Sequence, residues 1–276
     1  MAVAAGSVRE ALDASIDALA AAGVETPRLD AELLLAEASG LDRAELAADP
    51  EHPVEAGVAR AFGAMVRRRV QREPVAYILG RRGFRDLELA VDARALIPRP
   101  ETELLVEVAL ELEPATALDV GAGSGAVALA IADELPWARV TGTDASSAAL
   151  ELAAANARGL GLEDRVRFEA GSVPREGEFD LVVANLPYVR EHEWPALAPE
   201  ITRYEPREAL VAGPEGLEAI RSLVDEIAAR PPPALALEVG ADQAGSVAVL
   251  VRAAGFETVA PRRDLAGFER VVVGRR

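Results

Sequence analysis

Apolar residues in the first part of the chain recur at the spacing of helices. Ser7 can cap a helix whose apolar positions are Leu12, Ile16 and Leu19, close to the period of 3.6 residues. Further helical segments follow, and no strand pattern occurs among them. Residues 1–75 are therefore predicted to form a small helical domain.

The pattern changes between residues 76 and 100. Tyr77–Leu79 and Leu87–Leu89 are short apolar runs on either side of a glycine-containing turn, so we predict the two strands of a hairpin. Pro98 and Pro100 then interrupt the chain. This stretch is predicted to link the helical domain to the rest of the chain.

Predicted strands and helices alternate over residues 101–276. The predicted strands are 117–120, 140–143, 166–169, 179–184, 234–239 and 271–273. The predicted helices are 101–112, 125–134, 147–158, 217–229 and 243–254. Alternation at this spacing predicts an α/β domain with a mostly parallel sheet and helices on both faces. Such sheets bind ligands at the carboxyl ends of their strands.

The composition makes several kinds of chemistry unexpected. The 276 residues include no cysteine and only two histidines, so we expect no disulfide, no thiolate nucleophile and no metal site. The chain has no long charge-free apolar run of the kind that spans a membrane. Because residues 1–6 also lack the basic start of a signal peptide, we expect a cytoplasmic protein.

The net charge is −17, and all 29 basic residues are arginines. A strongly acidic chain repels a phosphate backbone, which argues against a nucleic-acid substrate. Arg67–Arg69 and Arg81–Arg82 could still form a local basic patch, but solvated arginines on a helix face or a hairpin are the commoner outcome for such runs.

A glycine loop joins the first predicted strand of the α/β domain to its helix. It reads Asp119-Val120-Gly121-Ala122-Gly123-Ser124-Gly125, and glycines let a backbone approach a ligand closely. Asp144 ends the next strand, 23 residues after Gly121, where a carboxylate can accept hydrogen bonds from ribose hydroxyls. The loop also fits a dinucleotide-binding pattern, so NAD binding stays open, as does a tight turn without a ligand.

The tetrapeptide Asn185-Leu186-Pro187-Tyr188 follows a strand that ends at the same sheet edge. An amide NH2 is a weak nucleophile, because its lone pair is delocalised, and it presents two N–H donors. The Asn185 side-chain oxygen and the Leu186 carbonyl can accept both donors, while Pro187 holds Leu186 extended and Tyr188 offers a flat face. This arrangement suits methyl transfer to a planar NH2 group, whereas a dehydrogenase has no need of it. The plainer alternative is that Asn185 starts a turn.

At this point the chain resembles the peptide chain release factor glutamine methyltransferase family over nearly its whole length. Further blocks carry the resemblance beyond the glycine loop and the tetrapeptide. They are Arg72–Gly80 followed by Phe84, Leu96–Glu103, Tyr204–Pro206 with Ala209–Leu210, and Asp264–Gly267 with Arg270. The resemblance implies a Rossmann-like class I methyltransferase fold with a seven-stranded sheet, formed by residues 101–276, and S-adenosyl-L-methionine as the cofactor.

The family methylates the N5 nitrogen of the glutamine in the Gly-Gly-Gln loop of class I release factors. By resemblance, Asn185, Leu186, Pro187 and Tyr188 would be catalytic, and Phe84 and Tyr188 would wall the glutamine pocket. The cofactor would be held by Asp119, Gly121, Ala122, Gly123, Gly125, Asp144, Ser172 and Asn185. The N-terminal helices would recognise the release factor. We expect a monomer with no membrane partner and no direct nucleic-acid binding.

Two positions depart from the family's usual pattern. Leu186 stands where the family usually has proline, and Asn-Leu-Pro-Tyr also occurs in ribosomal RNA adenine dimethylases. Ser172 stands where an acid commonly lies near the cofactor's adenine. The alternatives are therefore an adenine N6 methyltransferase, a ribosomal protein glutamine methyltransferase, and a non-catalytic cofactor-binding protein.

Overall fold

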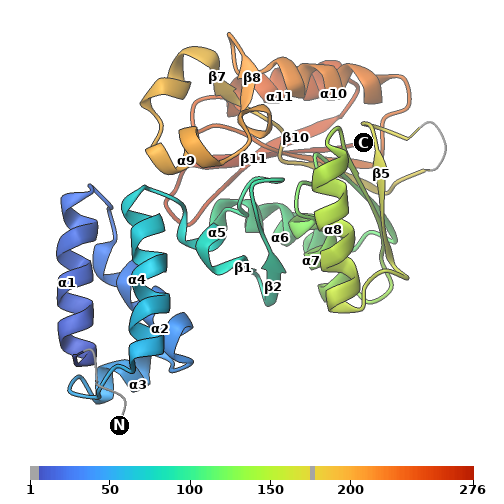
Figure 1. Cartoon of the computed structure of the whole chain (residues 1–276). Helices are drawn as coiled ribbons and strands as arrows, with labels where there is room; N and C mark the ends of the chain where they lie inside the picture. The colour runs from blue at the N-terminus through green and yellow to red at the C-terminus, as the bar shows by residue number, and fades with distance from the viewer. Residues whose placement is uncertain (1–5, 175–177) are drawn as a thin grey trace. The chain divides into compact units, whose positions relative to one another are not determined.

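The computed structural model describes residues 6–174 and 178–276 (Figure 1). Residues 1–5, on which the argument about a signal peptide draws, lie outside the described residues. The chain divides into two compact units. The helical unit comprises the residues up to Gly80 together with Ala198–Tyr204, and the sheet unit comprises Arg81–Leu197 and Glu205–Arg276.

The helical unit confirms the prediction of a small all-helical region at the start of the chain. Its helices are α1 (Val8–Ala21), α2 (Pro27–Ser39), α3 (Arg43–Ala48), α4 (Ala56–Val70), α5 (Val75–Leu79) and α9 (Pro199–Tyr204). Ser7 caps α1 as predicted, since its side chain accepts the Glu10 N–H while the Glu10 side chain accepts the Ser7 N–H. Leu34, Leu35 and Phe62 are buried in the core of this unit.

One predicted strand is wrong, because Tyr77–Leu79 lies in helix α5. The carbonyl of Pro74 accepts hydrogen bonds from the backbone N–H groups of Tyr77 and Ile78, which starts a helical turn. Gly80 ends that turn in the left-handed region, with φ of 73°. Proline and glycine therefore act here as helix boundaries, and the β-forming residues between them fill the core instead of a sheet.

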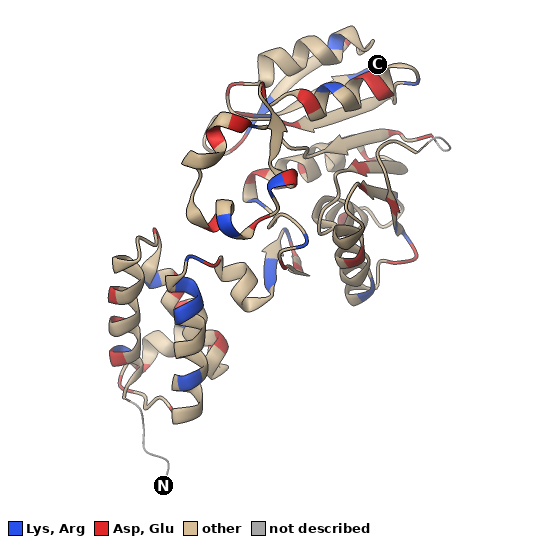
Figure 2. Cartoon of the chain, turned by 45° about the horizontal axis from the view of Figure 1, so that its top comes forward, with Lys and Arg blue, Asp and Glu red and all other residues tan. Residues whose placement is uncertain are grey.

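Helix α9 belongs to the helical unit although it lies far along the chain. Its Glu200 forms ion pairs with Arg69 at 2.8 Å and Arg72 at 2.6 Å, and Arg69 also pairs with Asp30 at 2.7 Å. All four side chains are largely buried, and buried charges require such partners. These contacts fix α9 to the end of α4 and, through Arg69, fix α4 to α2. Figure 2 shows the described arginines in blue, including those of this unit.

The described residues of the sheet unit form one large sheet of seven strands in the order β10-β11-β9-β6-β3-β4-β5. The strands are β3 (Thr116–Val120), β4 (Arg139–Asp144), β5 (Val166–Ala170), β6 (Leu181–Ala184), β9 (Ala234–Glu238), β10 (Thr258–Arg263) and β11 (Glu269–Arg275). Among the described strands of this sheet, β11 runs antiparallel to the other six, which confirms the mostly parallel sheet. The pattern of apolar residues did not predict β10.

Helices cover both faces of this sheet, as predicted. Those on one face are α6 (Glu103–Leu112), α7 (Ala126–Glu134) and α8 (Ser147–Leu160). Those on the other face are α10 (Glu218–Ala228) and α11 (Ala244–Ala253). Residues of β6 alternate between the two cores, with Leu181 and Val183 in the first and Val182 and Ala184 in the second.

Smaller elements complete the sheet unit. Two pairs of strands form separate small sheets, β1 (Arg81–Phe84) with β2 (Leu87–Ala90), and β7 (Val189–Arg190) with β8 (Val211–Gly213). Short 3-10 helices are η1 (Pro100–Thr102), η2 (Glu191–Ala196) and η3 (Arg207–Ala209). The predicted hairpin is thus present, but its first strand begins after Gly80. Within the described parts of the chain, no helix has the length and apolar character needed to cross a membrane.

Candidate active site

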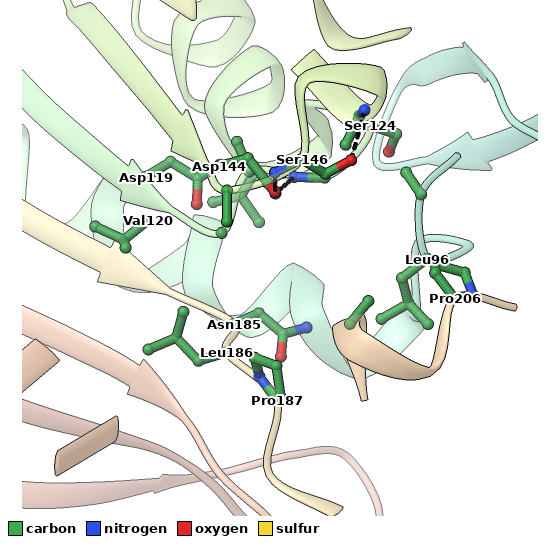
Figure 3. A pocket seen from close by; sticks show the side chains of 18 of the residues that line it. Leu96, Asp119, Val120, Ser124, Asp144, Ser146, Asn185, Leu186, Pro187 and Pro206 are labelled. Carbon is green, nitrogen blue, oxygen red and sulfur yellow. Dashed lines mark hydrogen bonds between the residues drawn. The ribbon is translucent and has the colours of Figure 1, made fainter. Parts of the chain in front are cut away.

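A cavity of about 630 Å³ lies at the carboxyl ends of β3, β4 and β6 (Figure 3). The glycine loop after β3, Asp144 at the end of β4 and the turn after β6 all line it. Parallel strands end at one sheet edge, so three segments distant in sequence meet there. Figure 3 shows Asp144 and Asn185 on opposite sides of the cavity.

Asp144 shapes the glycine loop and also faces the cavity. Its Oδ2 accepts the Gly123 N–H at 2.9 Å, and its Oδ1 accepts the Ser146 N–H at 2.8 Å. A carboxylate oxygen has two lone pairs, so each oxygen can accept a second hydrogen bond. The Asp144 carboxylate is therefore held in place and is still able to receive two hydroxyl groups of a ligand.

Gly121 and Leu186 fit against each other in the wall of the cavity. Gly121 has φ of 78°, and a Cβ at this position would lie 3.1 Å from Leu186 Cδ2. The Leu186 side chain also packs against the core under α10 and α11. Leucine in place of the family's usual proline is thus accommodated in space that the absent side chain of Gly121 leaves open.

Asp119 lies below the glycine loop, where it is almost completely buried. Its Oδ2 accepts the Ala128 N–H at 3.1 Å, which ties the end of β3 to the first turn of α7. Burial raises the pKa of Asp119 from 3.8 to about 7, and the nearby charge of Asp144 adds to the increase. The side chain is thus placed to support the loop from below.

The structure brings most of the predicted site residues to one cavity. Those in its lining are Asp119, Gly121, Ala122, Gly123, Asp144, Ser172, Asn185, Leu186 and Pro187. Three predicted residues lie outside the lining. Phe84 is 1% exposed in the core at the end of β1, and the helix-capping Gly125, with φ of 85°, leaves room for Phe168. Tyr188 directs its hydroxyl to Glu238 Oε1 at 3.3 Å, behind the cavity.

Sequence reasoning missed two polar residues around Asn185. The Asn185 Nδ2 group donates to Thr102 Oγ1 at 2.9 Å. Glu238, at the end of β9, is 1% exposed, and burial raises its pKa to about 7 while contacts with Thr102 and Tyr188 oppose the increase. The position of Glu238 at the end of a predicted strand was a usable signal in the sequence, but the pairing of Ala184 with Leu237, which places it beside Asn185, was not. Its burial could not be read from the sequence.

No group of three or more histidine, aspartate or glutamate side chains is placed to hold a metal ion among residues 6–174 and 178–276. The cavity is lined by backbone groups and apolar side chains, and its charged lining residues are Asp119, Asp144, Glu208, Arg94 and Arg99. These features fit an organic ligand that carries a ribose better than a bare cation.

Two family models match the sequence. The PrmC N-terminal domain matches residues 10–80, and a methyltransferase domain matches residues 117–204. Two solved structures share the fold. A methyltransferase from Pyrococcus furiosus has a TM-score of 0.52 at 18% identity, covering 68% of this chain and 88% of its own. The hMettl16 catalytic domain, in complex with the MAT2A 3'UTR hairpin 6, has a TM-score of 0.57 at 13% identity, covering 68% and 74%.

Several curated relatives match over almost the full length of both chains, and each bears the name release factor glutamine methyltransferase. The protein from Xylella fastidiosa is 44% identical over 93% of this chain and 96% of its own. The protein from Moorella thermoacetica is 43% identical over 98% and 99%, and that from Caulobacter vibrioides is 40% identical over 96% and 95%. This chain therefore belongs to the release factor glutamine methyltransferase family.

Proposed function

We propose that this chain transfers a methyl group from S-adenosyl-L-methionine to the side-chain amide nitrogen, N5, of a glutamine in a protein. The substrate is the glutamine of the Gly-Gly-Gln loop in class I release factors. The observation that carries the proposal is the position of Asn185, at the edge of a ligand-sized cavity and across from Asp144. Family membership supports the same reaction, and the translation machinery in the cytoplasm is where it would occur.

The residues that line the cavity fit S-adenosyl-L-methionine. The Asp144 carboxylate would hold the two ribose hydroxyls, and the glycine loop would admit the cofactor close to its backbone. The hydroxyl of Ser172, also in the lining, is available to the adenine as a neutral hydrogen-bond partner in place of an acid. When bound, the cofactor supplies a methyl group activated by its positively charged sulfur.

Asn185 and Leu186 would orient the glutamine amide for attack. The Asn185 side-chain oxygen accepts a hydrogen bond from one substrate N–H, and the Leu186 carbonyl accepts one from the other. These hydrogen bonds draw electron density toward the substrate nitrogen and hold its lone pair pointing at the methyl group. Proximity and orientation then supply much of the rate. The extra proton leaves the nitrogen after methyl transfer, when that nitrogen is positively charged, so no strong base is required.

Charge pairing of three of the five arginines in the two runs, Arg68, Arg69 and Arg81, supports a protein substrate over a nucleic acid. Arg68 pairs with Glu73 at 2.6 Å, and Arg69 is buried against Asp30. Arg81 pairs with Glu88 at 3.3 Å. Arginines neutralised by internal partners are poorly placed to form the basic surface that a phosphate backbone requires.

The test is methyl transfer from labelled S-adenosyl-L-methionine to a purified class I release factor, with its Gly-Gly-Gln glutamine either intact or changed to alanine. We expect label on the intact factor alone, mapped to that glutamine by mass spectrometry. Equal label on both factors would place the reaction at another residue. A ribosomal protein and a nucleic acid are offered as substrates in parallel. If only one of these were labelled, it would be the substrate in place of the release factor.

A further inference from the structure

Glu238 is a buried carboxylate beside the turn Asn185–Tyr188, the proposed catalytic turn. It ends β9, and the parallel pairing of Ala184 with Leu237 places it beside Asn185. Its Oε1 accepts the Tyr188 hydroxyl, but its Oε2 has no hydrogen-bond partner that meets normal geometry among the described residues. No arginine forms a salt bridge with it in the described part of the chain. A buried carboxylate without an ion pair is unfavourable for folding, so its position calls for another explanation.

Thr102 connects this carboxylate to Asn185. Thr102 stands at the N-cap of α6, where a threonine hydroxyl usually accepts a hydrogen bond from its own helix, but here it makes no such bond. The 5%-exposed Thr102 instead accepts a hydrogen bond from Asn185 Nδ2 and lies against the Glu238 carboxylate. The Thr102 hydroxyl is therefore directed toward the proposed catalytic turn.

The single hydroxyl proton of Thr102 then determines which end of the Asn185 side-chain amide faces Thr102. A threonine hydroxyl has one proton, and an ionised carboxylate can only accept; above pH 7, where Glu238 is ionised, the proton of Thr102 would therefore be directed toward Glu238. Thr102 Oγ1 is left as an acceptor, which only the NH2 end of Asn185 can satisfy. The opposite end of the amide, Oδ1, is then the end left for the substrate. The negative charge of ionised Glu238 would also polarise the Thr102 hydroxyl and the Asn185 amide toward Oδ1.

We infer that Glu238 and Thr102 are positioning residues that lock the Asn185 amide with its oxygen available to the substrate nitrogen. This inference rests on the proposed function, in which Asn185 Oδ1 accepts a substrate N–H. In Glu238→Gln, the new NH2 group can donate to Thr102, whose proton then turns to Asn185. The Asn185 amide is thereby released to present its NH2 group, which opposes the NH2 group of the substrate.

The kinetic test compares Glu238→Gln with Glu226→Gln, the same change at an exposed residue of α10. We expect Glu238→Gln to lower kcat by about 10- to 100-fold, less than removal of the Asn185 contact itself. The affinity for S-adenosyl-L-methionine should stay within twofold, and Tm should be unchanged or higher because a buried charge is gone. A drop in Tm that accompanies the loss of kcat, or kcat equal to that of Glu226→Gln, would overturn the inference.

Variants of Thr102 separate the hydroxyl from its bulk. Thr102→Ser should keep kcat within about threefold, Thr102→Val should match Glu238→Gln, and the combination of Thr102→Val with Glu238→Gln should be no worse than either alone. Additive losses would mean that the two residues act separately.

Nuclear magnetic resonance of the Asn185 NH2 group tests the orientation of this amide without any substrate. The result of this test therefore does not depend on whether the proposed function is correct. The NH2 signals are identified by their loss in Asn185→Asp. In the unmodified protein we expect one strongly hydrogen-bonded proton that moves in both Glu238→Gln and Thr102→Val, and not in Glu226→Gln. NH2 signals of Asn185 that shift in neither Glu238→Gln nor Thr102→Val would refute the inference, whatever the true methyl acceptor is.

Discussion

Replacing Asp144 with asparagine removes one negative charge and one acceptor while the shape of the side chain is kept. In the structure the two carboxylate oxygens accept backbone N–H groups, one from Gly123 and one from Ser146. Asparagine keeps one acceptor and places an NH2 donor against the other N–H. The free protein therefore loses one hydrogen bond to a charged group, and the bound cofactor loses one ribose hydrogen bond.

Each such bond is worth about 1.5–3 kcal/mol, so the lost ribose contact alone should raise the Kd for the cofactor by about 10- to 100-fold. Isothermal titration with S-adenosylhomocysteine, which cannot react, measures this effect. Asp133→Asn, which makes the same change at an exposed position of α7, is the matched control. Turnover at saturating cofactor should stay within a few-fold of the unmodified protein.

Two results would refute this reasoning about Asp144. A Kd within twofold of that of Asp133→Asn would mean that the carboxylate does not hold the cofactor. A loss of kcat at saturating cofactor as large as the loss of kcat/KM would instead place Asp144 in the chemical step.

The remaining predictions concern the catalytic turn, the buried acid and the helical unit. Asn185→Ala should lower kcat by about 10²–10³-fold with an unchanged Kd for S-adenosylhomocysteine, and steady-state kinetics with unaltered turnover would exclude the proposed role. The raised pKa of Asp119, about 7, means that its contribution to stability is complete below pH 3.8 and is lost as the pH rises through 7. Between pH 5 and 7.5 the unfolding free energy of Asp119→Asn should therefore fall by roughly 2–3 kcal/mol less than that of the unmodified protein, as measured by urea titrations. An equal fall in both proteins would contradict the raised pKa of Asp119. Glu200→Gln should weaken the helical unit by roughly 2–4 kcal/mol through its effect on Arg69 and Arg72, seen as faster amide exchange in α4 and α9, and equal exchange rates would show that the ion pairs are dispensable.

The elements with strong periodicity were predictable from the sequence. The core strands and the helices between them follow runs of apolar residues bounded by polar positions, and both faces of β6 are covered, so its residues are apolar throughout. The glycine loop and Asp144 were predictable because their spacing reflects one strand, one turn and one helix. The prediction failed for α5, where five residues are too few for a helical period to be distinguished from a strand.

Contacts between distant segments could not be predicted in the same way. Glu200 reaches Arg72 across 128 residues, and nothing near either residue in the sequence indicates the other. Glu238 ends its strand as an acid, which in the sequence looks like the polar end of an apolar run. Only the order of strands in the sheet, with β9 beside β6, turns that acid into a buried neighbour of Asn185.

The catalytic turn alone does not explain selectivity for glutamine. An adenine amino group also has a planar nitrogen with two N–H donors, so Asn185 and Leu186 could hold either group by the same hydrogen bonds. Discrimination must therefore come from the surfaces that admit the substrate. The net charge of −17 disfavours a nucleic-acid backbone, and the pairing of Arg68 with Glu73 reduces the free positive charge in one arginine run, whereas a protein loop needs no basic surface. Under the proposed function, selectivity in this chain would be a matter of what reaches the cavity, while the tetrapeptide Asn185–Tyr188 would determine which kind of nitrogen can react once it is there.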